Sequence, residues 1–392
     1  MLVVGLLGLG CQTRAVVVRT QECSRLCPGC CDAMGTCLTG EDVDACGAPG
    51  AACGSCGTGE ACVERACRAP SSPVVIDAGV DAGASPPRDA GVVQPPADAG
   101  AAPTPCPPDG WCLDGLSPAG MPVTTNHLRS VWALSTNDVW AVGDQGTVLH
   151  FDGASWTSVN TGLSDDLFAV WASGPSDVWI AGGSGQPSGT NGLVARFDGT
   201  RWTVVMRGLK RLEAIWGRSA GDIWFGGWNG TLLRWDGTSL AVAVSNTTKD
   251  IADLTGTATR VWAVGSSGLV LEFDGVSWRE VPTGMPNGLT VALALGPGSA
   301  WAAGGNGAFA SWDGTSWRTL SGPQDVTVMG LWGASPSAMW SVGPAGEVHR
   351  FSGVAPTRVS SPTTQFLRDV HGVDANHIWA VGFFGTVLRY RP

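Results

Sequence analysis

The sequence predicts an all-β protein whose main part is a seven-bladed β-propeller, preceded by a small disulfide-rich segment and a disordered linker. A tryptophan recurs at steps of 39, 45, 38, 39, 39 and 39 residues, a period typical of one propeller blade. Asp-Gly follows most of these tryptophans after 12 residues and indicates a hairpin. No window has a long apolar period of 3.6 residues, so we expect almost no helix. The recurring tryptophans are Trp140, Trp179, Trp224, Trp262, Trp301, Trp340 and Trp379.

Each repeat predicts four short strands, which in the first blade cover residues 128–135, 139–143, 147–152 and 155–159. The second strand, Val-Trp-Ala-Val, is apolar on both faces, as expected of a sheet packed between two neighbouring sheets. Asp152-Gly153 predicts a type I′ turn, in which both central residues have φ > 0. Eight residues before the middle tryptophan stands a further apolar residue, namely Trp132, Trp171, Trp216, Leu254, Leu293 or Trp332. Six residues after it stands a glycine, namely Gly146, Gly230, Gly268, Gly307, Gly346 or Gly385.

The long step in the repeat comes from an insertion at residues 184–191, rich in Gly, Ser, Pro and Asn. Loop tips carry binding specificity in many folds, but they also collect tolerated insertions. We favour tolerance and keep specificity as the alternative.

The seventh repeat has only three predicted strands, 367–373, 378–381 and 386–390, before the chain ends. A three-stranded last blade would leave an exposed edge. The segment 110–116 follows Asp109 and repeats the Asp-Gly and Trp pattern in compressed form. We therefore predict that it pairs antiparallel with residues 386–391 and closes a propeller domain that covers residues 106–392.

Residues 1–11 are apolar and end in Leu-Gly-Leu-Gly-Cys11. The apolar run is too short to span a bilayer. It resembles the end of a bacterial lipoprotein signal peptide, which implies that Cys11 is lipidated and anchors the protein in the outer membrane or at the cell surface. No Lys or Arg precedes the run, which would be explained if the true start lay upstream. Plain secretion is the alternative.

All 13 cysteines lie at or before Cys112, and 12 remain when Cys11 is set aside. An even number in a small exported segment predicts disulfides. Zinc is the alternative, because Cys27 and Cys30, like Cys53 and Cys56, have ligand-like spacing. We favour disulfides, because the segment holds six further cysteines, no His precedes His127, and the chain carries a predicted export signal. We expect no metal and no other cofactor. The predicted disulfide cysteines are Cys23, Cys27, Cys30, Cys31, Cys37, Cys46, Cys53, Cys56, Cys62, Cys67, Cys106 and Cys112.

The cysteine-rich segment, residues 12–67, is followed by a linker at residues 68–105 with four Asp-Ala-Gly triplets among prolines. Such a composition predicts an extended tether without a packed core. The order of cysteine-rich segment, Asp-Ala-Gly/Pro linker and propeller resembles surface lipoproteins of Gram-negative soil bacteria.

The repeats themselves resemble three groups of propellers. The segment Trp312–Trp317, Trp-Asp-Gly-Thr-Ser-Trp, is similar to the Asp-box of sialidase-like (BNR) repeats. The Val-Trp-Ala-Val-Gly pattern resembles tectonin repeats, which implies lectin-like binding, and photosystem-assembly-type propellers are a third, looser likeness. Sialidase chemistry needs a tyrosine nucleophile, but the only tyrosine, Tyr390, occupies the structural aromatic position of its repeat. We therefore reject sialidase activity and predict no catalytic residues.

Two sets of residues are candidates for ligand contacts. Trp228 lies outside the repeat columns, in the turn after Gly227, whereas tryptophans within the columns are expected to pack between blades. The residue before the third-strand aromatic is polar in every blade and could form a basic belt that binds an anionic glycan or polymer. The alternative is that these residues pair with neighbouring carboxylates. The belt consists of His150, Arg196, Arg234, Glu272, Ser311, Arg350 and Arg389, of which the basic members are candidate binding residues.

The net charge of −10 disfavours nucleic acid as a partner. Together these observations predict a monomeric, lipid-anchored, non-enzymatic surface protein whose propeller binds a glycan or an extracellular protein. The alternative is a polysaccharide hydrolase or lyase that uses carboxylates at one mouth of the ring.

Overall fold

The computed structural model describes residues 110–391, except 117–119, 184–188, 321–326 and 352–355, together with short strand segments between Cys30 and Arg68. The chain divides into two compact units, residues 1–95 and 96–392. In the first unit the described segments form three hairpins: β1 (Cys30–Cys31) with β2 (Cys37–Leu38), β3 (Glu41–Asp42) with β4 (Ala45–Cys46), and β5 (Ala61–Val63) with β6 (Ala66–Arg68). The predicted lipidation site Cys11 and the linker lie outside the described residues.

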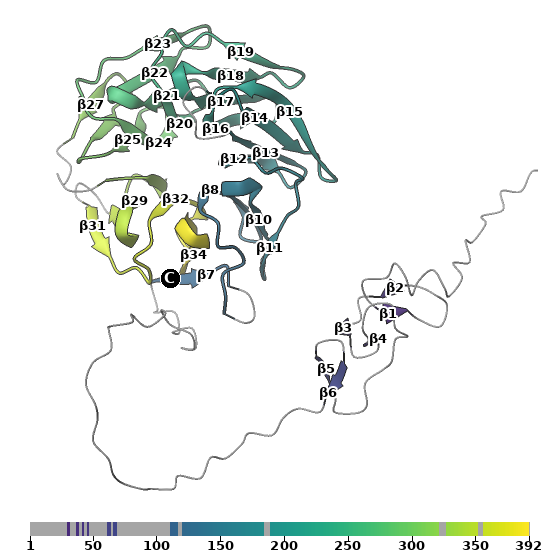
Figure 1. The fold of residues 1–392 in the computed structure, drawn as a ribbon. Coiled ribbons are helices and arrows are strands. Elements are labelled where there is room, and N and C mark those ends of the chain that lie inside the picture. The colour runs from purple at the N-terminus through teal and green to yellow at the C-terminus, as the bar shows by residue number, and fades with distance from the viewer. Residues whose placement is uncertain are drawn as a thin grey trace, which may run out of the picture. The chain divides into compact units, whose positions relative to one another are not determined.

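Seven four-stranded antiparallel sheets form the ring of the second unit, as predicted (Figure 1). The inner strands are β8 (Leu128–Ser135), β12 (Leu167–Gly174), β16 (Leu212–Ser219), β20 (Ile251–Gly256), β24 (Leu289–Gly296), β28 (Gly330–Ser335) and β32 (Leu367–Asp374). Second strands are β9 (Asp138–Gly143), β13 (Asp177–Gly182), β17 (Asp222–Gly227), β21 (Val261–Gly265), β25 (Ser299–Gly304), β29 (Ala338–Val342) and β33 (His377–Gly382). Third strands are β10 (Val148–Phe151), β14 (Gly192–Phe197), β18 (Leu232–Trp235), β22 (Leu269–Phe273), β26 (Phe309–Trp312), β30 (Val348–Phe351) and β34 (Val387–Arg391). The outer strands are β11 (Trp156–Ser158), β15 (Trp202–Leu209), β19 (Leu240–Ala243), β23 (Trp278–Glu280), β27 (Trp317–Thr319), β31 (Pro356–Val359) and, in the seventh blade, β7 (Gly110–Asp114).

The ring closes through β7, which pairs antiparallel with β34, from Gly110 opposite Arg391 to Asp114 opposite Val387. This is the pairing that the sequence predicts. Trp111 is only 1% exposed and packs against the rings of Trp340 and Tyr390. Cys112 on the same strand is disulfide-bonded, whereas Cys106, the other predicted disulfide cysteine after the cysteine-rich segment, lies outside the described residues.

The middle tryptophan of each of six blades packs against third- or fourth-strand aromatic residues of the following blade. Trp224, for example, lies 4.7 Å from the ring of Phe273 and 5.1 Å from that of Trp278. The other contacts are Trp140 with Phe197 and Trp202, Trp179 with Trp235, Trp262 with Trp312 and Trp317, Trp340 with Tyr390 and Trp111, and Trp379 with Phe151. Burial of these large rings between blades stabilises the ring through the hydrophobic effect and through ring–ring contacts.

Two glycines of the repeat are required by close contacts with the backbone. A Cβ on Gly143 would lie 2.0 Å from the carbonyl oxygen of His127. A Cβ on Gly146 would lie 2.0 Å from that of Leu163, and Gly146 also has φ +71°, a region open mainly to glycine. Gly143 precedes and Gly146 ends a 3₁₀ turn between the second and third strands. The turn therefore lies against the chain that enters the inner strand of its own blade, at His127, and of the next blade, at Leu163. Such turns are η1 (Asp144–Gly146), η2 (Trp228–Gly230), η3 (Ser266–Gly268), η4 (Pro344–Gly346) and η5 (Phe383–Gly385).

The Asp-Gly hairpins differ from the predicted type I′ turns. Phe151 pairs with Trp156, so the loop has four residues, and in Asp152-Gly153 only the glycine has positive φ. The backbone N–H groups of Ser155 and Ala154 donate to Asp152 Oδ1 at 2.8 and 2.9 Å and lower the pKa of its carboxyl group. The aspartate is therefore selected as a hydrogen-bond acceptor and not for a left-handed backbone.

The fourth blade differs by one residue from the predicted column of apolar residues on the inner strands. Trp132 pairs with Trp140 in the first blade, but in the fourth blade Thr255, and not Leu254, pairs with Trp262. The residue opposite the middle tryptophan therefore precedes it by one residue fewer in the fourth blade than in the first. The sequence does not reveal this shift, because an apolar residue, Leu254, stands at the expected position.

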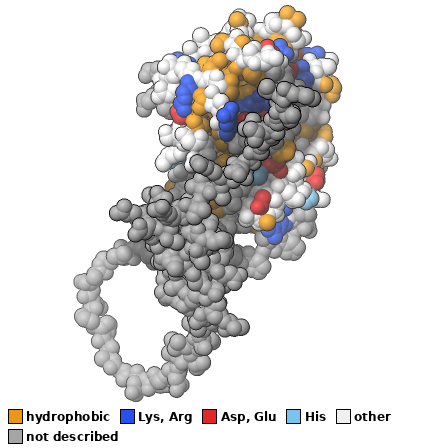
Figure 2. Space-filling model, turned by 90° about the vertical axis from the view of Figure 1, so that its right-hand side faces the viewer, with side chains coloured by type: hydrophobic (Ala, Val, Ile, Leu, Met, Phe, Trp, Pro, Cys, Tyr) orange, Lys and Arg blue, Asp and Glu red, His pale blue; other side chains and the backbone are white. Residues whose placement is uncertain are grey.

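The outer strand β15 is longer than other outer strands and carries two exposed valines, Val204 and Val205. Figure 2 views the ring from the side on which β15 lies in Figure 1, and it shows hydrophobic side chains interspersed with basic and acidic ones. On the part of this side that the structure describes, hydrophobic side chains adjoin one another, with basic groups among them.

Candidate functional site

The inner strands of all seven blades enclose a central cavity of about 300 Å³. One residue at or beside the start of each inner strand lines one mouth of this channel, and these residues differ sharply around the ring. The blades with β32, β8, β12 and β16 contribute charged or aromatic side chains, whereas the other three blades contribute small or uncharged ones. The residues, in ring order, are Arg368, Arg129, Phe168, Glu213, Ala252, Thr290 and Met329.

Aromatic rings and arginines alternate around the polar half of this mouth. Arg129 lies 5.2 Å from the ring of Phe383 and 5.6 Å from that of Phe168. Arg211 also contacts the ring of Phe168, at 3.9 Å, and it lies 4.5 Å from the ring of Trp228. We call this set the aromatic–arginine stripe; it consists of Phe384, His127, Phe383, Arg129, Phe168, Arg211 and Trp228.

Carboxylates hold both arginines of the stripe in place. The Nε and Nη2 groups of Arg129 donate to the two oxygens of Asp144 at 2.7 and 2.8 Å. Arg211 Nε donates to Glu213 Oε1 at 2.6 Å, and Trp228 Nε1 donates to the same oxygen at 2.8 Å. Because these side chains are already ordered, they would lose less conformational entropy when a ligand binds to them.

The 3₁₀ turns bring the outer part of the stripe to the channel mouth. Asp144 belongs to η1, Trp228 to η2 and Phe383 to η5, and each turn docks beside the start of an inner strand. The repeat geometry therefore places non-repeating side chains from different blades around one opening.

Phe384 has an unusual backbone and is exposed. Its φ is +55° and its side chain is 56% exposed, while its backbone N–H donates to His127 Nδ1 at 3.1 Å. Equivalent left-handed positions in other blades carry Gln145, Asn229, Ser267, Asn306 and Ala345. A bulky aromatic residue in this conformation is strained, and such strain is concentrated at functional sites.

Two carboxylates line the channel below the mouth. Asp369 accepts the backbone N–H of Val131, and Asp253 accepts that of Ala292 at 2.8 Å, in each case from the next blade. Desolvation by burial raises the pKa of Asp253 to about 7 and that of Asp369 to about 6. Burial also lowers the pKa of His371 to about 3.

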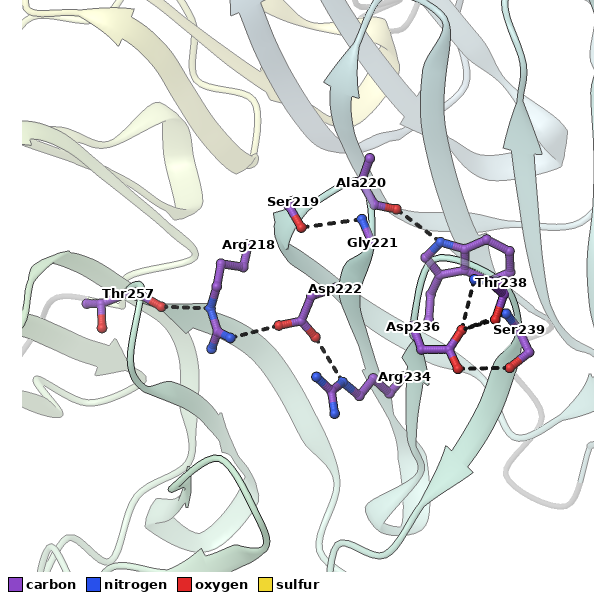
Figure 3. A network of polar contacts seen from close by, with 11 residues as sticks. Arg218, Ser219, Ala220, Gly221, Asp222, Arg234, Asp236, Thr238, Ser239 and Thr257 are labelled. Carbon is purple, nitrogen blue, oxygen red and sulfur yellow. Dashed lines mark hydrogen bonds and ion pairs between the residues drawn. The ribbon is translucent and has the colours of Figure 1, made fainter.

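The structure places the predicted basic belt away from this mouth, on the third strands. Arg234 Nε donates to Asp222 Oδ1 at 2.9 Å, and Asp222 also binds Arg218, whose Nε reaches the carbonyl of Thr257 in the next blade (Figure 3). The partner aspartates stand at the start of the second strands, at the opposite end of the blade from the start of the inner strands. Three further members of the belt are also paired: His150 with Asp138 at 2.9 Å, Arg196 with Asp177 at 2.7 Å, and Glu272 with Arg260 and Arg279.

The last two members of the belt contact aromatic rings. Arg350 lies 5.5 Å from Trp340, and Arg389 lies over Phe151 and Trp379. The belt is thus not a single cluster in the described structure, and its role in ligand binding stays a prediction. Trp228, in contrast, lies in the stripe.

Sequence analysis missed the charged and aromatic residues at the channel mouth. Arg129, Phe168 and Arg368 share one repeat column, directly after the first apolar residue of the inner strand. The signal that could have found them is the change of residue type along a column in an otherwise regular repeat.

Within the described residues, no helix has the length and apolar character required to cross a membrane. In the same part of the chain, no group of three His, Cys, Asp or Glu side chains is arranged to hold a metal ion.

No family model matches the sequence, and neither does any curated protein. Solved propellers are similar in fold. The structure "YCF48 bound to D1 peptide" has a TM-score of 0.58 and 18% identity, covering 72% of this chain and 97% of that one. The WD40 propeller domain of Doa1 has a TM-score of 0.57 and 14% identity over 71% of this chain and 96% of its own. Streptogramin B lyase has a TM-score of 0.59 and 12% identity, with coverages of 68% and 93%. At these identities, what the chain shares with all three is the β-propeller fold.

Proposed function

We propose that the propeller is a non-enzymatic binding module that binds a segment of a protein partner along the aromatic–arginine stripe. The observation that carries this proposal is the exposed Phe384, held in a strained backbone at one end of the stripe. Aromatic residues and arginine are the residue types most enriched at the energetic centres of protein interfaces. The ordered arginines add donors whose positions are fixed before binding.

A protein partner fits the stripe better than a glycan. The stripe crosses several blades and combines apolar rings with cations, which suits the side chains of an extended peptide. A solved propeller of similar fold is described as bound to a peptide. Lectin-like glycan binding remains an outcome of the test below.

The competing function is carboxylate-dependent cleavage of a polysaccharide, either by hydrolysis or by the elimination reaction of a lyase. Asp253 and Asp369 are the residues that favour it, because a carboxyl group with a raised pKa suits general acid catalysis. Both side chains, however, accept backbone N–H groups of their own and the next blade. We therefore assign them to the structure of the ring.

The decisive experiment screens the purified full-length chain against a displayed random peptide library and a polysaccharide panel, scored for binding and for product release. Phe384→Asn and Trp228→Ser should each weaken recovered peptides at least about tenfold. Val276→Ser is the matched control, because Val276 is 90% exposed in an Asp-Gly hairpin away from the mouth. Peptides whose binding survives both stripe variants, or polysaccharide cleavage abolished by Asp253→Asn, would overturn the proposal.

We also propose that Cys11 is lipidated and that the protein is displayed at the cell surface. The apolar run that ends at Cys11 supports this. Metabolic fatty-acid labelling should be lost in Cys11→Ala, and the variant should leave the membrane fraction. A wild-type protein found wholly in the medium would contradict the anchor.

A further inference from the structure

Arg368 differs from the other two arginines at the channel mouth in having no partner. It stands near the start of β32, lines the central cavity and is partly exposed there. Within the described residues, its guanidinium group makes no hydrogen bond and no ion pair. Arg129 and Arg211, by comparison, are held by Asp144 and Glu213.

The environment of Arg368 does not suit an unpaired cation. Burial lowers the pKa of its guanidinium; the charges of Glu213 and Asp369 oppose this shift, while Arg129 and Arg211 add to it. A charge removed from water without a hydrogen-bonding partner is unfavourable. An anion that entered the mouth would supply the missing partner and would also be attracted by the two neighbouring arginines.

We infer that Arg368 is the centre of a carboxylate-binding site at the mouth of the channel. A guanidinium group can bind a carboxylate through two parallel N–H···O bonds, which gives both affinity and orientation. Glu213 and Asp369 offset part of the positive charge of the three arginines, so the site suits a monoanion better than a phosphate dianion. This inference rests on the proposed function and specifies it: the bound protein segment presents a carboxylate to Arg368 while it contacts the stripe.

The test uses acetate as the probe, acetamide as its neutral counterpart and inorganic phosphate as the dianion. Each is titrated into the full-length chain, and the arginine Nε–Hε resonances are followed by NMR. Acetate should shift the resonance of Arg368 in a saturable way, whereas acetamide should not, and phosphate should bind more weakly than acetate.

Four variants separate recognition from a structural role. Arg368→Gln should lower the affinity for acetate about tenfold, and Arg368→Lys should have an intermediate effect because it keeps the charge but loses the paired donors. Glu213→Gln should strengthen acetate binding, because it removes a competing negative charge. Arg201→Gln, at an exposed arginine in the hairpin loop before β15, should change nothing. Circular dichroism and thermal unfolding establish that each variant is folded.

Unchanged acetate affinity in Arg368→Gln, equal binding of acetamide, or tighter binding of phosphate would overturn the inference. Peptides that bind the stripe equally well in Arg368→Gln would contradict the carboxylate site but would leave the proposed function intact. Acetate binding at Arg368, with no peptide ligand recovered in the screen, would support the carboxylate site and contradict the proposed function.

Discussion

Asp369 of the seventh blade accepts the backbone N–H of Val131 in the first blade at 2.9 Å, across the junction where the ring closes. Two residues further along, His371 Nδ1 accepts the N–H of Ala133 at 3.1 Å. The same arrangement recurs between the fourth and fifth blades, where Asp253 and Thr255 accept the N–H groups of Ala292 and Ala294. Side chains of one blade thus satisfy the free edge of the next inner strand, which has no strand partner on the channel side.

Asp369→Ala should therefore destabilise the propeller, because it leaves the N–H groups of Val131 and Val370 without their acceptor. Loss of such acceptors inside a protein costs about 1–3 kcal/mol in the free energy of unfolding. Asp369→Asn, which retains one acceptor oxygen, should lose less. Urea unfolding at a fixed pH measures both, and equal stability of Asp369→Ala and wild type would show that water replaces the carboxylate.

Asp253 should make stability depend on pH. Its pKa is raised from 3.8 to about 7, so its contribution is fully present below pH 3.8 and is lost as the pH rises through about 7. Asp253→Asn removes this dependence. The stability of the variant relative to wild type should consequently rise between pH 4 and pH 8, as measured by urea unfolding across that range. A difference that does not vary with pH would mean that the carboxyl group titrates normally.

His371 should act in the opposite direction. Its pKa is lowered from 6.5 to about 3 by burial, so its neutral form stabilises the fold above pH 6.5, and this contribution is lost as the pH falls toward 3. Between pH 7 and pH 4, His371→Gln should lose less stability than wild type. NMR titration of the His371 ring provides an independent check: a ring that becomes protonated near pH 6.5 in the folded protein contradicts the prediction.

Trp111→Ala should weaken the closure of the ring. Trp111 is 1% exposed, and removal of a large buried aromatic side chain costs about 3–5 kcal/mol. Leu113→Ala on the same strand is the matched control, because Leu113 is 48% exposed. If the two variants have similar midpoints in urea, β7 contributes little to the stability of the ring.

Phe384→Asn should stabilise the protein while it weakens binding of the partner. Asparagine occupies the equivalent left-handed position at Asn229 and Asn306, and relief of the strain should add about 1 kcal/mol to the free energy of unfolding. A stabilised variant with reduced binding is the pattern expected of a residue kept for function. A loss of stability would show that the contact of the ring with His127 outweighs the strain.

The sequence sufficed to predict the number of blades, the position of most strands and the closing strand, because these depend on repeated local patterns. The turn at Asp152-Gly153 and the register of Thr255 escaped prediction, since both depend on which of several short pairings the blade adopts. The stripe could not be predicted because Arg129, Phe168 and Arg211 meet only once separate blades curve around a common axis. Trp228 was found because it interrupts a regular pattern, whereas Arg129 and Arg368 occupy a column whose residue type varies from blade to blade.

The position of β7 decides how the propeller would respond to mechanical force. Its first residue, Gly110, lies opposite Arg391 at the rim of the seventh blade. A force transmitted along the preceding chain would act on one end of this edge strand and would break its hydrogen bonds one after another. Cys112 is disulfide-bonded, and a bridge to Cys106 would shift the loading point to the middle of the strand, beyond the first two residue pairs. The disulfide would then protect the outer residue pairs of the closing strand from the applied force.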